Sequence, residues 1–194
     1  MAPDRIRTVP DSEQGEIETG SPGGRYRVGV LLYFRSDQGE VLLIRRARRP
    51  NMGLWCAVGG KLEMASGESP FECAIREAQE EVGAVLEEDN LALRCMLSER
   101  SYEGTGHWLM FLFEVRPRLA SLPPPIDEGV FEFFEVDALK ELDMPLLDRK
   151  ILLECILNPD ASEYCVIHAP KGTEIEPSLL VWEQKTGDRV GMQE

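Results

Sequence analysis

The residues best able to do chemistry in this sequence are three glutamates at helical spacing. Glu77, Glu80 and Glu81 lie in the acidic stretch REAQEEVG, which begins at Arg76. At roughly 100° per residue, their carboxylates fall within about 100° of arc on one helix, beside an apolar stripe. Like charges at this spacing destabilise a bare helix by roughly 0.2–0.5 kcal/mol per pair. A hard divalent cation such as Mg²⁺ reverses this cost, because it binds several carboxylates together with phosphate oxygens.

A lone ExxEE stretch is best interpreted as a solvated acidic face. Two neighbouring features favour a metal-binding site here instead. Arg76 stands directly before the first acid and can hold Glu77 with bidentate geometry. The pair Gly59 and Gly60 leads into a loop before the helix, and glycine permits close backbone approach and positive φ angles. A solvated face leaves both features without a purpose.

Residues 60–83 read GKLEMASGESPFECAIREAQEEVG, which resembles the Nudix box, G-x5-E-x7-R-E-U-x-E-E-x-G-U, where U is a bulky aliphatic residue. The matching positions are Glu68, Arg76, Glu77, Glu80, Glu81 and Gly83. Seven residues rather than five separate Gly60 from Glu68, which places a two-residue insertion near residues 64–66. Both U positions are alanines, Ala78 and Ala84. These departures remove no acid from the box.

The resemblance implies hydrolysis of a phosphoanhydride bond with Mg²⁺ or Mn²⁺ as the cofactor. By motif position, the expected metal ligands are the Gly60 carbonyl, Glu77, Glu80 and Glu81. Arg76 is expected to orient Glu77.

Two further acidic roles follow from the resemblance. Glu68 is expected to pair across the junction between loop and helix. The general base lies either in the box or in a distant loop, because family members use both arrangements. Among the loop acids we favour Glu128 over Glu103, with a solvated surface role as the alternative for each.

Substrate-binding candidates come from other parts of the chain. The basic run RRARR offers Arg45 to phosphates, with a solvated strand end as the alternative. The segment LWCAVGGK resembles the W-x-x-x-G-G-K pattern of MutT-like members, which implicates Trp55 and Lys61. Residues 107–115 resemble a strand that in Nudix proteins helps line the base pocket, so His107 and Trp108 are candidates, although a core strand is the safer interpretation of each residue alone.

The carboxyl-terminal pattern through residue 157 resembles 8-oxo-dGTP diphosphatase-like Nudix domains. It favours a nucleoside triphosphate, with oxidised purines included, cleaved to monophosphate and pyrophosphate. A dinucleoside polyphosphate, or another dinucleotide or nucleotide sugar, is the alternative, because Tyr102 falls where such hydrolases carry a tyrosine. A non-catalytic nucleotide sensor is a second alternative. Against it stand the complete set of box acids and the lack of an attached basic region or helix-turn-helix pattern.

The elements that position these residues follow from hydrophobic patterning. Apolar runs predict strands at residues 28–34, 41–44, 54–58, 91–102, 107–115 and 130–136. Asp137 is expected to cap a short helix, and Asp143 a longer one at residues 144–157. Strands around one acidic helix, with helices after the last strand, indicate an α/β protein. The resemblance adds the Nudix fold, an α/β/α sandwich around a mixed β-sheet.

The chain divides into three parts. Residues 1–24 are polar and turn-rich, which predicts a mobile N-terminal arm. The Nudix hydrolase domain is expected at residues 25–157. Residues 158–194 are a C-terminal extension with strand-like segments at 164–168 and 178–184. We expect an added hairpin there, packed on the domain or exchanged with a second subunit in a homodimer.

Composition limits the partners. The 194 residues carry a net charge of −14, which argues against binding a nucleic-acid polymer and leaves a small nucleotide as the expected partner. The sequence contains neither a signal-peptide core nor an apolar run near the roughly 18 residues that span a membrane. The expected location is therefore cytoplasmic, without membrane attachment. The five cysteines show no CxxC or Cys/His ligand spacing, which indicates buried, reduced thiols.

Overall fold

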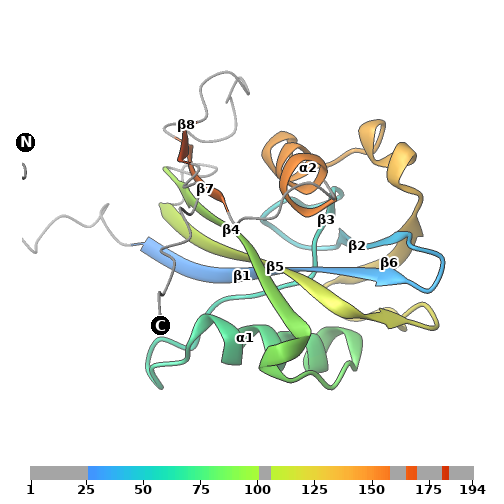
Figure 1. Cartoon of the computed structure of the whole chain (residues 1–194), viewed down its shortest axis with the longest axis horizontal. Coiled ribbons are helices and arrows are strands. Elements are labelled where there is room, and N and C mark those ends of the chain that lie inside the picture. The colour runs from blue at the N-terminus through green and yellow to red at the C-terminus, as the bar shows by residue number, and fades with distance from the viewer. Residues whose placement is uncertain (1–25, 101–105, 158–164, 170–180, 184–194) are drawn as a thin grey trace, which may run out of the picture.

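The computed structural model describes residues 26–100, 106–157, 165–169 and 181–183 (Figure 1). Residues 1–24 of the expected arm, and the candidates Tyr102 and Glu103, lie outside the described residues. The described helices and strands are β1 (Tyr26–Ser36), β2 (Val41–Arg46), β3 (Trp55–Cys56), α1 (Pro70–Glu77), η2 (Ala78–Val82), η3 (Glu88–Asn90), β4 (Leu91–Glu99), β5 (His107–Leu119), β6 (Gly129–Phe134), η5 (Val136–Lys140), α2 (Leu146–Ile151), η6 (Leu152–Ile156), β7 (Cys165–Ala169) and β8 (Val181–Glu183).

The strands form one mixed sheet in the order β3-β2-β1-β5-β4-β7-β8, with β6 also paired to β2. The pairs β1–β5 and β4–β7 are parallel, and the other pairs are antiparallel. Helix α1 covers one face of the sheet and α2 covers the other (Figure 1). The expected α/β/α sandwich around a mixed sheet is confirmed.

Strand β1 is buried on both faces, as its nearly continuous apolar sequence predicts. Successive side chains of a strand point to opposite faces. Leu32 and Phe34 accordingly join the core under α1, whereas Tyr33 joins the core under α2. The two cores hold the helices on either side of the same central strands.

The acidic helix begins and ends where its sequence directs. The Ser69 hydroxyl accepts a hydrogen bond from the Glu72 N–H, the Glu72 carboxylate accepts one from the Ser69 N–H, and Pro70 occupies the first turn. From Ala78 the helix continues as a π-helical turn. It ends at Gly83, whose φ of 73° lies in the left-handed region that glycine tolerates best.

The predictions that Asp137 and Asp143 cap helices are wrong. Asp137 lies in the first turn of η5, after the N-cap residue Glu135. Helix α2 starts at Leu146 after Pro145, whose ring restricts φ and whose ψ of 131° keeps the chain extended. Asp143 is therefore too far from the helix to cap it, and its carbonyl instead accepts the Trp55 N–H at 2.9 Å.

Beyond the last helix, two further strands extend the sheet. Strand β7 runs parallel to β4, with Cys165 opposite Cys95, and β8 runs antiparallel to β7. Strand β5 is longer than predicted and β4 shorter, ending at Glu99. In the part of the chain that the structure describes, no helix is long and apolar enough to cross a membrane.

Candidate active site

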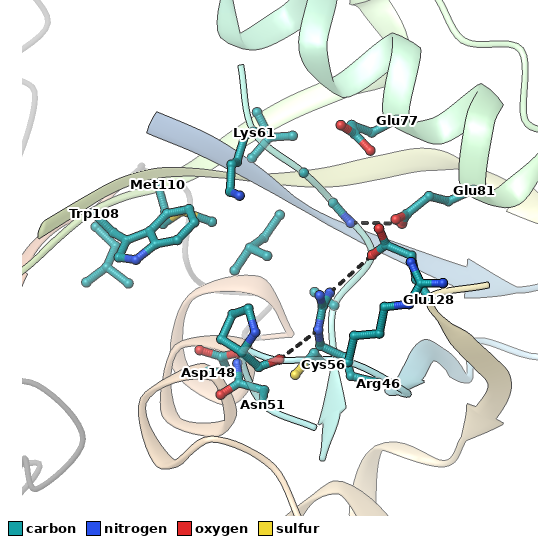
Figure 2. Close-up of a pocket in the computed structure, with 18 of the residues that line it drawn as sticks. Arg46, Asn51, Cys56, Lys61, Glu77, Glu81, Trp108, Met110, Glu128 and Asp148 are labelled. Carbon is teal, nitrogen blue, oxygen red and sulfur yellow. Dashed lines mark hydrogen bonds and ion pairs between the residues drawn. The ribbon is translucent and has the colours of Figure 1, made fainter. Parts of the chain in front are cut away.

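A cavity of about 470 Å³ opens beside the acidic helix, within the size range of small-molecule sites (Figure 2). Figure 2 shows Glu77, Glu81 and Glu128 on one side of it and Trp108 and Asp148 on the other. The first group comes from the helix and from the loop before β6. The second comes from β5 and α2.

Arg76 organises the acidic side of the cavity. Its Nε and Nη2 donate to the two oxygens of Glu68 at 2.8 and 3.0 Å, a bidentate pair across the junction of loop and helix. This pairing lowers the pKa of Glu68 to about 2. The Arg76 Nη1 donates to Glu77 Oε1 at 2.7 Å, and Nη2 also donates to the Lys61 carbonyl. The guanidinium thus holds both the loop and Glu77.

The two-residue insertion does not disturb this arrangement. Residues 63–67 are exposed, with Met64 at 68% exposure, and of these only Glu63 lines the cavity. The Glu63 N–H donates to Glu68 at 2.7 Å, which closes the turn onto the box. The extra residues are therefore accommodated in solvent.

Gly60 lets Glu77 approach the loop backbone. A Cβ atom on Gly60 would collide with the Glu77 carboxylate, so no other residue fits there without displacing it. The Gly60 carbonyl, predicted as a metal ligand, accepts the Val30 N–H at 2.9 Å. One lone pair of that oxygen is therefore directed at β1.

Glu77 and Glu81 are crowded by one another and by Glu128. Burial raises the pKa of Glu77, and the Arg76 hydrogen bond opposes that rise. Burial, the Glu77 charge and the Glu128 charge raise the pKa of Glu81 to about 7, although Glu81 also accepts the Gly59 N–H at 3.2 Å. Clustered carboxylate oxygens of this kind are the donor set that a hard divalent cation prefers. The residues present therefore fit such an ion.

Glu80 differs from its neighbours. Its side chain is 59% exposed, does not line the cavity, and accepts a hydrogen bond from Arg76 Nη1 at 3.1 Å. A π-helical turn takes more residues than an α turn, so side chains four positions apart stay aligned while those three apart diverge. Glu77 and Glu81 consequently share the cavity, and Glu80 points away from it.

Among the predicted substrate-binding residues, Lys61 lines the cavity and Arg45 and Trp55 do not. Arg45 and Trp55 are partners in the β2–β3 ladder, so both point to the same side of the sheet, where Trp55 packs on Phe134. Arg45 is exposed there and donates to the Gly53 carbonyl.

The neighbours of these residues line the cavity instead. Arg46 and Cys56 point to the opposite face of the same two strands. The Arg46 guanidinium forms an ion pair with Glu128 at 3.6 Å and donates to the Pro50 carbonyl. Arg48 and Arg49 also line the cavity, so the basic run contributes through members other than the one expected.

On β5 the cavity takes Trp108 and not His107, whose ring lies 5.4 Å from that of Tyr26. Trp108 is 8% exposed, and its Nε1 has no hydrogen-bond partner among the described residues. The Lys61 Nζ lies 6.0 Å and the Arg27 Cζ 5.5 Å from its ring centroid. Trp108 therefore presents an unpaired donor in a cationic setting.

Two carboxyl groups of the cavity wall were not predicted from the sequence. Burial, with a smaller contribution from Asp148, raises the pKa of Glu99 to about 8. Burial raises the pKa of Asp148 to about 7, although some of its surface remains open to the cavity. The available signal was period-two alternation, since Glu99 follows Cys95 and Leu97 on the buried face of β4.

The NUDIX domain family profile matches residues 25–155, more than half of the chain. The chain belongs to the NUDIX family. Members generally use a divalent metal ion such as Mg²⁺, in agreement with the carboxylates that crowd the cavity of this Nudix domain.

Three similar proteins place the domain more closely. It is 38% identical over 89 residues to the 8-oxo-dGDP phosphatase NUDT18 of Homo sapiens, over 45% of this chain but only 24% of that protein. It is 32% identical over 116 residues to the uncharacterized Nudix hydrolase YvcI of Bacillus subtilis, over 58% of this chain and 69% of that one. A solved MutT protein from Bacillus halodurans matches with a TM-score of 0.62 at 27% identity, over 81% of this chain and 97% of that one.

The matched segment thus spans about a quarter of the length of the human relative. The comparisons confirm the resemblance to MutT-like members and class the domain with the Nudix pyrophosphohydrolases.

Proposed function

We propose that this Nudix domain hydrolyses a nucleoside triphosphate, with oxidised purines among its substrates, to a monophosphate and pyrophosphate. The observation that carries the proposal is the division of one cavity into an acidic, metal-competent end and an end with partly desolvated hydrogen-bonding groups. The first end suits a diphosphate with its counter-ion. The second suits a nucleobase.

At the acidic end, Glu77 and Glu81 would hold Mg²⁺ or Mn²⁺, and Glu80 would join them if its side chain turned inward. When bound, the ion neutralises phosphate oxygens and acidifies water. Arg76 fixes Glu77 through the 2.7 Å hydrogen bond. Glu128, which faces the same space, accepts the proton of the attacking water at a carboxylate oxygen.

Cationic side chains hold the remaining phosphate charge. Lys61, Arg48 and Arg49 all line the cavity, and arginine binds phosphate oxygens with two parallel hydrogen bonds. Arg46 is committed to Glu128 at 3.6 Å, so its role is to position that carboxylate. The net charge of −14 does not oppose binding, because these cations and a bound metal ion set the local potential.

At the other end, the raised pKa values leave Glu99 largely protonated and Asp148 partly protonated at neutral pH. A protonated carboxyl offers one donor and one acceptor, which matches the adjacent N–H and C=O groups along a purine edge. The Trp108 Nε1–H, which has no hydrogen-bond partner in the described part of the chain, adds a third fixed donor. An 8-oxo group would add a carbonyl at C8 and an N–H at N7 on the imidazole side of the base, and the human relative is an 8-oxo-dGDP phosphatase.

A substrate panel tests the proposal. Ordinary and 8-oxo nucleoside triphosphates and diphosphates, diadenosine polyphosphates, ADP-ribose and NADH are each incubated with Mg²⁺, with Mn²⁺ and with EDTA, and the products are separated by ion-exchange chromatography. We expect metal-dependent release of monophosphate and pyrophosphate from a purine triphosphate. Release of phosphate from a diphosphate alone would move the substrate to the diphosphate class. Cleavage of a dinucleotide would favour the dinucleoside polyphosphate alternative, and tight binding without turnover would favour a sensor.

A further inference from the structure

Three cysteine thiols meet on the sheet face covered by α2, behind the wall of the active-site cavity. Cys95 on β4, Cys155 on η6 and Cys165 on β7 have their Sγ atoms within 4.8 Å of one another. Sequence spacing did not indicate this cluster, because Cys155 follows Cys95 by sixty positions. All five cysteines of the chain are described, and none forms a disulfide.

Two of these thiols are in direct contact. The Sγ atoms of Cys155 and Cys165 lie 2.9 Å apart, whereas Cys95 is the register partner of Cys165 on the neighbouring strand. Cys95 and Cys155 are buried, and Cys165 is partly exposed. Cys165 is the least buried of the three residues, and the Cys155 thiol is in direct contact with it.

The surroundings favour the thiolate of Cys165. Hydrogen bonds from the Cys155 and Cys95 thiols, with help from the Arg94 guanidinium, lower the pKa of Cys165 below the usual thiol range. Arg94 is held beside the cluster by its hydrogen bonds to the Cys155 carbonyl at 3.2 and 3.4 Å. The thiolate is the form that attacks oxidants and disulfides.

A metal site is the competing interpretation of three converging thiols. Structural zinc takes four ligands, and the described residues bring only three together. His168 does not supply a fourth, because it lies three positions after Cys165 and so points to the other face of β7. Three thiolates around one monovalent cation would leave buried negative charge, whereas a disulfide is uncharged.

We propose that Cys155 and Cys165 form a reversible disulfide when the protein meets a hydroperoxide. The Cys165 thiolate attacks the peroxide oxygen, which cleaves the O–O bond and leaves a sulfenic acid and hydroxide or alkoxide. The Cys155 sulfur then attacks the sulfenic sulfur, and the hydroxyl group departs as water with the Cys155 proton. Two thiols are oxidised by two electrons, and one hydroperoxide is reduced.

The bond would fasten β7 to the helical segment that carries Asp148. Cys155 follows Asp148 by seven residues, about two helical turns, on the same segment of α2 and η6. Cys95 lies two positions before Leu97 and four before Glu99, which both line the cavity. Oxidation therefore links the added strand to the wall of the active site, independently of which nucleotide that site takes.

Mass spectrometry of the full-length protein tests the pair. Reduced protein is treated with a stoichiometric amount of hydrogen peroxide, and its intact mass and thermal unfolding are compared before and after dithiothreitol. We expect the loss of two hydrogens and a higher melting temperature, both reversed by dithiothreitol. Cleavage after Glu154 and Glu163 separates the two cysteines, so the bond appears as a cross-linked pair of peptides.

Variants decide between a pair and a trio. Cys155→Ala and Cys165→Ala should each abolish the mass loss, whereas Cys95→Ala should keep it, and thermal unfolding of each reduced variant checks that it folds. A disulfide that includes Cys95, or wild-type protein that keeps its mass, would overturn the proposal. Stoichiometric zinc or copper(I) in the purified protein, lost in Cys95→Ala as in the other two variants, would overturn it in favour of a metal site.

Discussion

The two ends of the active-site cavity are built in different ways. The acidic end comes mainly from one continuous stretch, residues 59–81, in which the loop, Arg76 and two glutamates contact one another. The opposite end is assembled from β4, β5 and α2, which are far apart along the chain. Site residues that share one helix can therefore be predicted from their spacing in the sequence. Site residues that come from different strands can be identified only once the pairing of those strands is known.

The two ends also use carboxyl groups differently. At the acidic end, Glu77 and Glu81 repel one another but have Arg76 and the Gly59 N–H as partners for their charge. At the other end, Glu99 is buried without such a partner among the described residues, and burial favours its neutral acid form. Burial raises pKa values at both ends, but Arg76 and the Gly59 N–H favour the anionic forms of Glu77 and Glu81, whereas Glu99 exchanges hydrogen bonds as the neutral acid.

The largest expected effect is at the acidic end. Glu81→Gln should lower kcat by about a thousandfold or more, which corresponds to about 4 kcal/mol of transition-state stabilisation. The amide oxygen can still accept the Gly59 N–H, so circular dichroism and melting temperature should stay close to wild type. Glu88→Gln, at an exposed acid of η3, is the matched control. Retention of more than about a tenth of the activity would contradict the metal-ligand assignment.

An intermediate effect is expected at the loop that closes the acidic end. Glu128→Gln should lower kcat by about a hundredfold with little change in KM, as expected for loss of a general base. Asp127→Asn is the control, because that side chain is 95% exposed and lies directly before Glu128. Steady-state kinetics on the best substrate compares the two variants. Equal kcat values for the two variants would mean that the general base is a residue of the Nudix box and not Glu128.

A stability effect is expected at the opposite end. The pKa of Glu99 is about 8 in the folded protein and 4.5 ordinarily, so the folded state keeps a proton that the unfolded chain releases. The free energy of unfolding should therefore be greatest near pH 4.5 and should fall as the pH rises from about 4.5 to about 8. Glu99→Gln should flatten this dependence and gain a few kcal/mol at the upper end, at about 1.4 kcal/mol per pKa unit.

Urea unfolding of wild type and Glu99→Gln at mildly acidic and mildly alkaline pH measures this difference. Glu132→Gln, a more exposed acid of β6, serves as the control. Parallel pH curves for wild type and Glu99→Gln would show that the Glu99 carboxyl ionises freely in the folded state.

The smallest effect is expected at the insertion. Met64→Gln should change the free energy of unfolding by less than about 0.5 kcal/mol and leave kcat/KM nearly unchanged, because the side chain is 68% exposed and lies outside the cavity. Thermal melts and kinetics check both values. A clear rise in KM would contradict this prediction, because it would mean that the longer turn contacts the substrate.

Two predicted site residues lie one position away from the residues that line the cavity. Arg76 and Glu77 were identified because helical neighbours follow from spacing alone, and the structure places their side chains 2.7 Å apart. The motifs indicate Trp55 and Arg45, yet strand alternation directs both side chains away from the cavity, which Cys56 and Arg46 line instead. When a strand is buried on both faces, its hydrophobic pattern does not show which face lines the active site.

In the acidic helix, too, residue types predict some features and not others. Its capping box, its start at Pro70 and its end at Gly83 follow from residue types alone. The π-helical turn from Ala78 does not, and it turns Glu80 away from the cavity that holds Glu77 and Glu81. Wheel geometry assumes one constant angle per residue, which this turn does not keep.

By itself, the sequence determined most of the acidic end of the site, because capping, helical spacing and loop glycines act between residues close along the chain. Its resemblance to the Nudix box implied the family and the α/β/α architecture. Tertiary structure alone decided which tryptophan, arginine and buried acid enter the cavity, and which thiols meet behind it. Those outcomes depend on strand register and on burial, and both arise only when segments distant in sequence pack together.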